Sequence, residues 1–422
     1  MSLNIVVFAK KKYNNHKYLG FIPKLHSEET MTIELDILQS LGIAIIALIL
    51  GNLLKDRISF LRTFFIPSPV IGGLIISIIV LILQESGICT LTFDKVIQDF
   101  FMNIFFTAIG LSASFGMLKK SGTLGIKLAI AIIILLPLQN IIGVTLAKIL
   151  GINPLHGIAM GSTSMTGGIG SAISFGKIME EMGAESNISI GVAAATFGLL
   201  AGSLVGGPTA RRLIAKNNLI SQGSLSSKKI SDIKNITNQK TLTRAIIIIG
   251  LAAFLGTFIN KILAMTGLNF PYYVGCQFGG LIVRNIYDSL KKPLDMDNID
   301  LVGNISLSLF LSLALINLNI SAILTLAGPM LIILIAQAIF IAIYTSLVTF
   351  NLLGRNYDAA VMVAGHCGVG LGQTPNAMAN MEAIIEEKGA ADVAMFIFPI
   401  VLAIAVNLTN PIVITFFINH FA

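Results

Sequence analysis

The chain has 422 residues, of which 55% are hydrophobic and only 12% are charged. A soluble globular protein carries about twice that share of charged residues, so the composition excludes an ordinary soluble domain. The apolar residues occur in blocks of about 20, long enough to cross the hydrocarbon core of a membrane as helices. The net charge of +7 comes from basic residues between these blocks, which indicates membrane orientation and not nucleic-acid binding.

The first residues differ from the rest of the chain. Residues 1–30 are polar and basic, and no apolar stretch of the signal-peptide type follows their lysines. Met31 stands just before the first long apolar block, which begins near Ile37. We interpret residues 1–30 as a disordered or misannotated N-terminal extension and Met31 as the natural start.

Ten apolar segments are predicted to span the membrane as helices. They lie at 37–54, 66–84, 100–117, 124–150, 187–210, 244–264, 270–290, 301–320, 325–353 and 391–419. Two further segments, 156–183 and 358–388, are rich in Gly, Ser, Thr and Asn and break their own periodicity. Irregular backbone at membrane depth is tolerated only when it is buried in protein or lines a wet cavity, so both segments are predicted to be re-entrant hairpins.

Basic residues set the predicted orientation. They follow the first, third and fifth spans and are densest in the segment 211–243, whereas the loop 85–99 carries Glu85, Asp94 and Asp99 against Lys95. By the positive-inside rule the first span starts outside and the segment 211–243 is a solvated cytoplasmic connector.

Short motifs recur in the same order in the two halves of the chain. The matching pairs are Pro67 with Pro271, Gly72-Gly73 with Gly279-Gly280, Gly168-Ile169-Gly170 with Gly368-Val369-Gly370, and Gly207-Pro208 with Asn410-Pro411. Each half holds an odd number of spans, so the second half starts on the opposite side and the repeat is inverted. We expect an all-α integral membrane protein with about ten transmembrane helices and two re-entrant hairpins in two inverted five-span repeats, at 31–210 and 244–422. Such repeats, broken at matching places, are typical of secondary transporters.

The two broken segments carry the candidate binding chemistry. Glycines let the backbone turn and free its N–H groups at helix N-termini, which favour an anion, while hydroxyls and freed carbonyls suit Na⁺. The candidate substrate-binding residues are Ser164, Thr166, Gly167, Gly168, Ser171, Gly365, His366, Gly368, Gly370 and Thr374. The glycines could instead serve only close helix packing, but two matching segments favour a site. For His366 a structural hydrogen bond is favoured over a proton relay.

Polar groups inside the predicted spans are candidates for a path or an ion site. The candidate Na⁺-binding residues are Asn103, Thr163, Asn304, Asn407 and Asn410. Gln139, Asn140 and Gln337 lie at corresponding places in the fourth and ninth spans. Intramembrane amides as often bond across helices, so both roles stay open. His366 and Cys367 show no metal-ligand spacing, and no metal site is predicted.

Several blocks resemble the bacterial glutamate:sodium symporter family. They are Phe65-Ile66-Pro67, Phe105-Phe106, Ala195-Thr196-Phe197-Gly198, Gly303-Asn304, Asn356-Tyr357-Asp358, and the most specific one, Gly365-His366-Cys367-Gly368 with Gly370-Leu371-Gly372 and Thr374-Pro375. The resemblance covers about residues 31–420. It implies import of L-glutamate across the bacterial inner membrane, with Na⁺ as the coupling ion and no organic cofactor. It also implies a transport domain that bears the hairpins, a scaffold that forms a homodimer, and an elevator motion between them.

Two positions differ from the family pattern. Ile169 stands where the family has a His, and Asn407 stands where it has an Asp. These departures leave open an Na⁺- or H⁺-coupled carrier of another organic anion, such as a dicarboxylate or another amino acid. A channel would need rings of charge or a continuous polar stripe. An enzyme would need a nucleophile–base pair, and ATP coupling a Walker-type loop, and the sequence offers neither.

Overall fold

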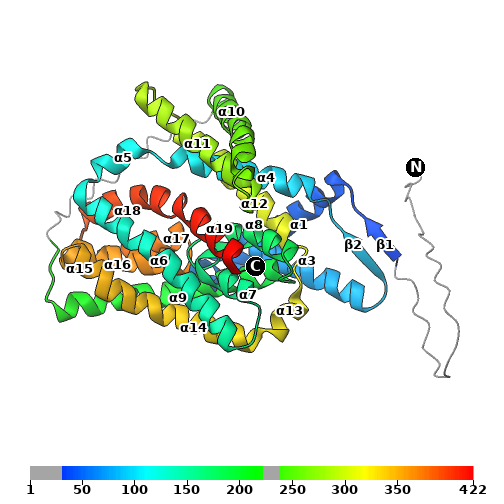
Figure 1. Ribbon diagram of the computed structural model, residues 1–422, viewed down its shortest axis with the longest axis horizontal. Helices are drawn as coiled ribbons and strands as arrows, with labels where there is room; N and C mark the ends of the chain where they lie inside the picture. The colour runs from blue at the N-terminus through cyan, green and yellow to red at the C-terminus, as the bar shows by residue number, and fades with distance from the viewer. Residues whose placement is uncertain (1–30, 222–237, 422) are drawn as a thin grey trace.

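The computed structural model describes residues 31–221 and 238–421 (Figure 1). The predicted extension at 1–30 and the middle of the predicted connector lie outside these ranges. Nine helices in the described part are long and apolar enough to cross a membrane, and they coincide with nine of the ten predicted spans. The tenth is α11 (Tyr272–Ser289), which has the length but carries polar residues such as Gln277 and Arg284. The predicted all-α membrane class is confirmed.

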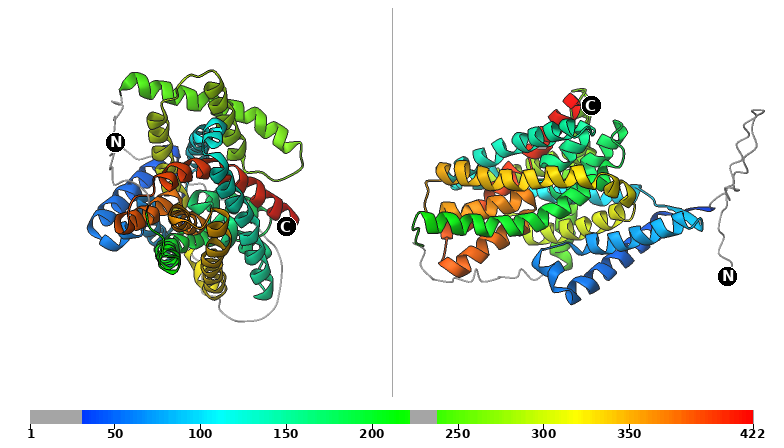
Figure 2. Two further views of the ribbon diagram at one scale, coloured as in Figure 1. Left: turned by 90° about the vertical axis from the view of Figure 1, so that its left-hand side faces the viewer. Right: turned by 90° about the horizontal axis from the view of Figure 1, so that it is seen from below.

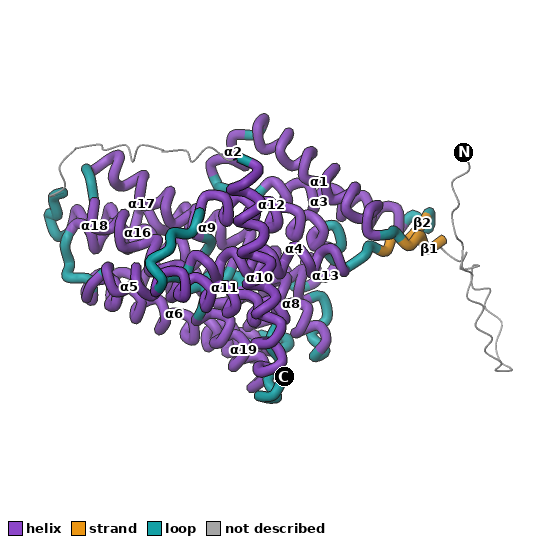
Figure 3. Tube along the Cα trace, turned by 90° about the horizontal axis from the view of Figure 1, so that it is seen from above, coloured by secondary structure: helices purple, strands orange, loops and turns teal. Residues whose placement is uncertain are grey.

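One group of helices, here called the panel, combines the first three spans of each half. Its helices are α1 (Ile37–Arg57), α3 (Ser68–Glu85), α4 (Val96–Ser112), α10 (Gln239–Ala264), α11 and α12 (Met296–Leu315). The short α2 (Ser59–Thr63) follows α1. Two strands that the sequence did not predict, β1 (Met31–Glu34) and β2 (Cys89–Thr92), pair in parallel beside α1 and α3 at one end of the molecule (Figure 3).

The other group, here called the bundle, combines the remaining spans with the two broken segments. Its elements are α6 (Gly122–Ile149), α7 (Pro154–Ile158), the π-helical turn η1 (Ala159–Thr163), α8 (Gly168–Glu181), α9 (Asn187–Lys216), α14 (Ala327–Tyr344), the π-helical turn η2 (Thr345–Thr349), α15 (Phe350–Leu352), α16 (Tyr357–Leu371), α17 (Thr374–Lys388), α18 (Asp392–Ala405) and α19 (Thr409–Phe421). The short α5 (Phe115–Lys120) and α13 (Ile320–Thr325) connect the panel to the bundle. The last predicted span, 391–419, consists of two helices, α18 and α19, with a turn at 406–408.

Panel and bundle are distinct packing units. The panel helices pack mainly against one another, as do the bundle helices, and few elements join the two groups. In Figure 2 the blue N-terminal helices and the orange helices of the second hairpin accordingly occupy different parts of the molecule. This division places both predicted hairpins in one unit.

Small residues hold the panel together. A Cβ on Gly110 would lie 2.0 Å from the carbonyl oxygen of Gln277, so α4 and α11 touch backbone to backbone. Gly72 on α3 lies as close to Ala47 on α1, and Gly279 on α11 to Ala252 on α10. Without a hydrophobic force between helices in lipid, such close approach supplies the packing energy. The α1–α3 and α10–α11 contacts use the matching Gly-Gly motifs of the two halves.

Both broken segments are hairpins. Gly365 and Gly368 of α16 face Met381 and Ala377 of α17, so these two arms run antiparallel. In the first segment α7 folds back along α6, where Gly157 meets Gly143, and α8 folds along α9.

An ion pair links the second hairpin to α9. Arg211 Nε lies 2.6 Å from Glu387 Oε2. The hydrogen bond from Arg211, with a second from Lys388, lowers the pKa of Glu387. The pair therefore lies within the bundle, joining α17 to α9.

The close approach at Gly110 gives a stability test. Gly110→Ala adds a methyl group that the Gln277 carbonyl cannot accommodate, and overpacking of this kind costs about 1–3 kcal/mol. We expect the apparent Tm in detergent to fall by roughly 5 °C. The matched control is Gly250→Ala on α10, where a Cβ would meet nothing within 4 Å in the described part of the chain. There the better helix propensity of Ala should keep or raise the Tm. Equal Tm values for the two variants would contradict the close α4–α11 contact.

Candidate functional site

The tips of the two hairpins touch. Gly168, the first residue of α8, has a φ of +68°, and a Cβ there would lie 2.7 Å from Nε2 of Gln373 at the tip of the second hairpin. The contact lies beside Gln139 and Gln337, near the middle of the long helices α6 and α14. The tips therefore meet at about half the depth of the bundle.

The Gln139 side chain forms hydrogen bonds with both hairpin tips. Its Nε2 donates to the Gly370 carbonyl at 2.6 Å, and its Oε1 accepts from Thr166 Oγ1 at 2.6 Å. Gln337 of α14 donates to the backbone carbonyl of Gln139 at 2.8 Å. Gln139 is fully buried, so water cannot reach its amide. These bonds satisfy its polar atoms instead, which avoids the cost of burying them unpaired. One side chain thus spans both hairpins.

The broken backbone of the first hairpin is satisfied by amides. Gly161 has a non-helical ψ of −140°, which frees polar groups next to it. Asn140 Oδ1 accepts from Ser162 N at 2.9 Å, and Asn140 Nδ2 donates to Ser162 Oγ at 2.9 Å. Asn410 of α19 donates to the Ser162 carbonyl at 3.0 Å. These contacts assign a structural role to intramembrane amides that the sequence left open.

Two helix N-termini lie at the junction of the tips. No side chain among the described residues caps α8 at Gly167 or α17 at Gln373. The N-terminus of a helix carries partial positive charge and free N–H groups, which is a ready site for an anion. Thr374, the first residue of α17, is exposed, so this end is open. Ser171 lies one turn along α8 and is buried.

Three buried oxygens on η1 and α19 have no hydrogen-bond partner in the described part of the chain. They are Thr163 Oγ1, Asn410 Oδ1 and Thr415 Oγ1. Thr163 belongs to η1 and the other two to α19, and these elements pack together. Neutral oxygens left unsatisfied in a buried place are suitable ligands for Na⁺. Two of the five predicted ion ligands thus lie on adjoining elements.

Other predicted site residues lie elsewhere or serve packing. Gly365 and Gly368 lie between the arms of the second hairpin, and Ser164 Oγ donates to the Gly191 carbonyl at 2.8 Å. The His366 ring is fully buried, with Nδ1 3.0 Å from Thr349 Oγ1, away from the tips. This bond matches the structural role favoured from the sequence.

The remaining predicted ion ligands do not gather at one place. Asn103 lies on α4 with a buried Oδ1 that has no partner among the described residues, and Asn304 is exposed on α12. Asn407 lies in the turn between α18 and α19, where its carbonyl accepts from Gln277 Nε2 at 2.7 Å. This turn brings the bundle into direct contact with the panel.

The sequence did not single out Gln277 or Gln373. Gln373 follows the glycine break Gly370-Leu371-Gly372, which was the available signal for a residue at a tip. Gln277 lies within an apolar helix and offered no such signal, because its partner is a backbone carbonyl distant in the chain.

Comparison with known proteins identifies the family. Residues 33–390 match the family model described as Sodium/glutamate symporter. The chain belongs to the sodium/glutamate symporter family. It is 36% identical over 397 residues to the sodium/glutamate symporter of Escherichia coli (strain K12), covering 91% of this chain and 98% of that protein. The Haemophilus influenzae sodium/glutamate symporter is also 36% identical, over 88% of this chain and 94% of its own. The resemblance inferred from the sequence is confirmed.

A solved structure also aligns along most of the chain. It is a sodium proton antiporter from Methanocaldococcus jannaschii, with a TM-score of 0.42 and 14% identity over 91% of this chain and 96% of the other.

The two departures from the symporter family pattern lie in different surroundings. Ile169 is fully buried within the apolar core that includes Phe106 and Phe310. Asn407 is half-buried at the turn between α18 and α19. An apolar side chain at 169 therefore matches its apolar neighbours in this symporter family member.

The role of Gln139 can be tested by hydrogen–deuterium exchange of the backbone amides at the tips. Gln139→Met keeps the side-chain volume but leaves the Thr166 hydroxyl and the Gly370 carbonyl unpaired, at a cost of about 1–3 kcal/mol each. We expect the amides of 164–168 and 370–374 to exchange at least about tenfold faster, measured by hydrogen–deuterium exchange mass spectrometry. Gln84→Met, at an exposed position on α3, is the control and should leave both peptides unchanged. Unchanged exchange in Gln139→Met would show that the tips are held together without this side chain.

Proposed function

We propose that this protein is a secondary active transporter that imports L-glutamate together with Na⁺ across the cytoplasmic membrane. The observation that carries the proposal is the contact of the two hairpin tips, Gly168 against Gln373, between two uncapped helix N-termini. The curated relatives are named for sodium and glutamate, which supplies the substrate and the coupling ion.

The chemistry of the tips suits a carboxylate. The segments 161–172 and 364–376 contain no Asp, Glu, Lys or Arg, so no side chain at the tips competes with an incoming anion or neutralises it. The partial positive charge at the starts of α8 and α17, with the hydroxyls of Ser171 and Thr374, would hold the substrate carboxylates. Hydrogen bonds to an ionised group are about twice as strong as neutral ones.

For Na⁺ we propose a site on η1 and α19. Thr163 and Asn410 offer two buried neutral oxygens whose hydrogen-bonding capacity is unused among the described residues. Na⁺ is a transported substrate here, and its ligands would be satisfied only when it is bound. Asn410 also donates to the Ser162 carbonyl, so ion binding and the shape of the first tip share one side chain.

We further propose how the molecule moves and assembles. The panel would be the scaffold of a homodimer, and the bundle the transport domain that carries both hairpins in an elevator motion. The paired contacts α1–α3 with α10–α11, and α3–α12 with α4–α11, are those that two inverted repeats would make. The basic residues after α1, α5 and α9 support a cytoplasmic position for these ends by the positive-inside rule.

Transport is tested in proteoliposomes with an inward Na⁺ gradient against a matched K⁺ gradient. We expect Na⁺-dependent accumulation of labelled L-glutamate above equilibrium. Gly168→Val and Gly368→Val should each reduce it at least about tenfold, because a misplaced tip disrupts the bound geometry. Gly250→Val is the control and should transport normally. No accumulation by folded protein would contradict the proposal, and dicarboxylates under a pH gradient would be tested next.

The elevator motion is tested with two ion pairs, one between bundle and panel and one within the bundle. Lys177 of α8 lies 3.0 Å from Asp99 of α4, so this pair crosses from bundle to panel. The Arg211–Glu387 pair lies within the bundle. In a background with Cys89, Cys276 and Cys367 replaced by Ser, we compare Lys177→Cys/Asp99→Cys with Arg211→Cys/Glu387→Cys, each bridged by a short bis-maleimide.

Bridging should lower uptake at least about tenfold in the crossing pair and leave it nearly unchanged in the internal pair. Each unbridged variant should transport well, because an exposed ion pair contributes only about 0–1 kcal/mol. Full uptake in the bridged crossing pair would show that α8 does not move against α4.

A further inference from the structure

A cationic cavity lies at the membrane face where α4 and α11 end and α18 begins. It has a volume of about 630 Å³ and is bounded by α5, the end of α11, the loop after it and the first turns of α18. Four basic side chains line it, namely Lys120, Arg284, Lys291 and Lys292. The proposed orientation makes this the cytoplasmic face. None of these residues belongs to the site at the hairpin tips.

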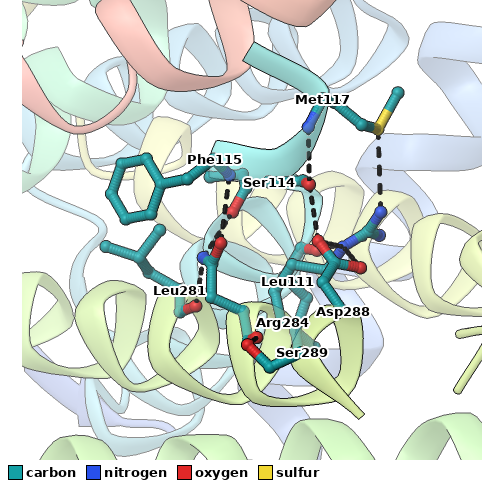
Figure 4. A network of polar contacts seen from close by, with 10 residues as sticks. Leu111, Ser114, Phe115, Met117, Leu281, Arg284, Asp288 and Ser289 are labelled. Carbon is teal, nitrogen blue, oxygen red and sulfur yellow. Dashed lines mark hydrogen bonds and ion pairs between the residues drawn. The ribbon is translucent and has the colours of Figure 1, made fainter. Parts of the chain in front are cut away.

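The one carboxylate in the cavity is already engaged. Asp288 lies 3.2 Å from Arg284 Nε and accepts a hydrogen bond from Ser114 Oγ at 2.5 Å (Figure 4). Lys120, Lys291 and Lys292 are exposed and form no ion pair with any residue that the structure describes. The lining therefore carries three lysines that are not paired with its one carboxylate.

Backbone hydrogen bonds hold two of these lysines in place. Lys291 has a φ of +55°, and its N–H donates to the Asp288 carbonyl at 3.1 Å. The N–H of Lys292 donates to the Tyr287 carbonyl at 3.0 Å. The chain thus turns sharply at the end of α11, which places the backbone of both lysines at the cavity rim.

Part of the lining is apolar. It includes Met117, Phe396 and Ile400, and Phe396 is 56% exposed. Basic side chains beside exposed apolar ones at a membrane face form a surface with two chemistries. A phosphate group suits the first and an acyl chain suits the second.

We propose that this cavity binds an anionic phospholipid, with its phosphate among Lys120, Lys291 and Lys292 and an acyl chain along Met117 and Phe396. The lipid would touch α11 of the panel and α18 of the bundle at once. A molecule that bridges these two units stabilises the arrangement in which both parts of the cavity are present. Anionic lipid would therefore favour the observed relative placement of panel and bundle over others.

The test measures the thermal stability of the full chain in detergent with added dioleoylphosphatidylglycerol. Dioleoylphosphatidylcholine and inorganic phosphate are the comparison probes. We expect phosphatidylglycerol to raise the Tm by about 3 °C or more, and both comparison probes to raise it by less than half as much. Equal protection by phosphatidylcholine would overturn the proposal. Equal protection by inorganic phosphate would show a free-anion site and overturn the lipid assignment.

Substitutions test whether the Tm shift caused by phosphatidylglycerol arises at this cavity. Lys291→Gln/Lys292→Gln should lose at least half of the phosphatidylglycerol shift, whereas Arg212→Gln/Lys216→Gln should keep it. The control pair removes the same charge near the end of α9, at the same proposed membrane face, without lining the cavity. Lys120→Gln provides a milder second variant, expected to lose part of the shift. Full shifts in the cavity variants would overturn the assignment. The measurement does not involve transport, so its outcome is independent of the proposed substrate.

Discussion

Backbone polar groups at membrane depth must find partners inside the protein, and the hairpins depend on this constraint. The chain breaks at Gly161 and again at Gly372, and each break frees N–H and carbonyl groups. Asn140 and Asn410 satisfy the first break around Ser162, and Gln139 joins Thr166 to Gly370 across the two tips. The amides come from α6 and α19, which pack against the hairpins. Most polar groups at the breaks are therefore paired within the protein. The few that stay unpaired are available to a ligand.

The division into panel and bundle follows from where small residues lie. Gly72, Gly110 and Gly279 bring panel backbones into contact, and Gly198 brings α9 against the Leu371 carbonyl within the bundle. Helices in lipid associate through such contacts and not through a hydrophobic force. Contacts between the two groups are sparser and include side-chain interactions, such as the Lys177–Asp99 pair and the Gln277–Asn407 bond. Apolar side chains also pack across this interface, since the core around Ile169 includes Phe106 and Phe310.

Much of the fold could be predicted from the sequence, because length and hydropathy determine membrane helices and Gly-rich breaks mark hairpins. The ten spans and both broken segments were found in this way. The turn at Asn407 was missed, since the apolar run continues through it and nothing local marks a break. The β1–β2 pair was missed because strand pairing joins residues far apart in the chain. The candidate site was predicted at the two broken segments, and within them Gly365, Gly368 and His366 lie in packed interfaces. Which side of a buried helix faces a tip depends on partners that periodicity does not specify.

The placement of the two proposed sites bears on coupling. Thr163, a proposed Na⁺ ligand, and Ser171, a proposed carboxylate ligand, lie on the two arms of the first hairpin, in η1 and α8. A buried charge without a partner costs several kcal/mol, so either ion alone would bind poorly at this depth. A cation and an anion on one tip each reduce the cost of burying the other, and this effect is reciprocal by thermodynamic necessity. With no charged side chain in the tip segments, the ions themselves must supply the compensating charge.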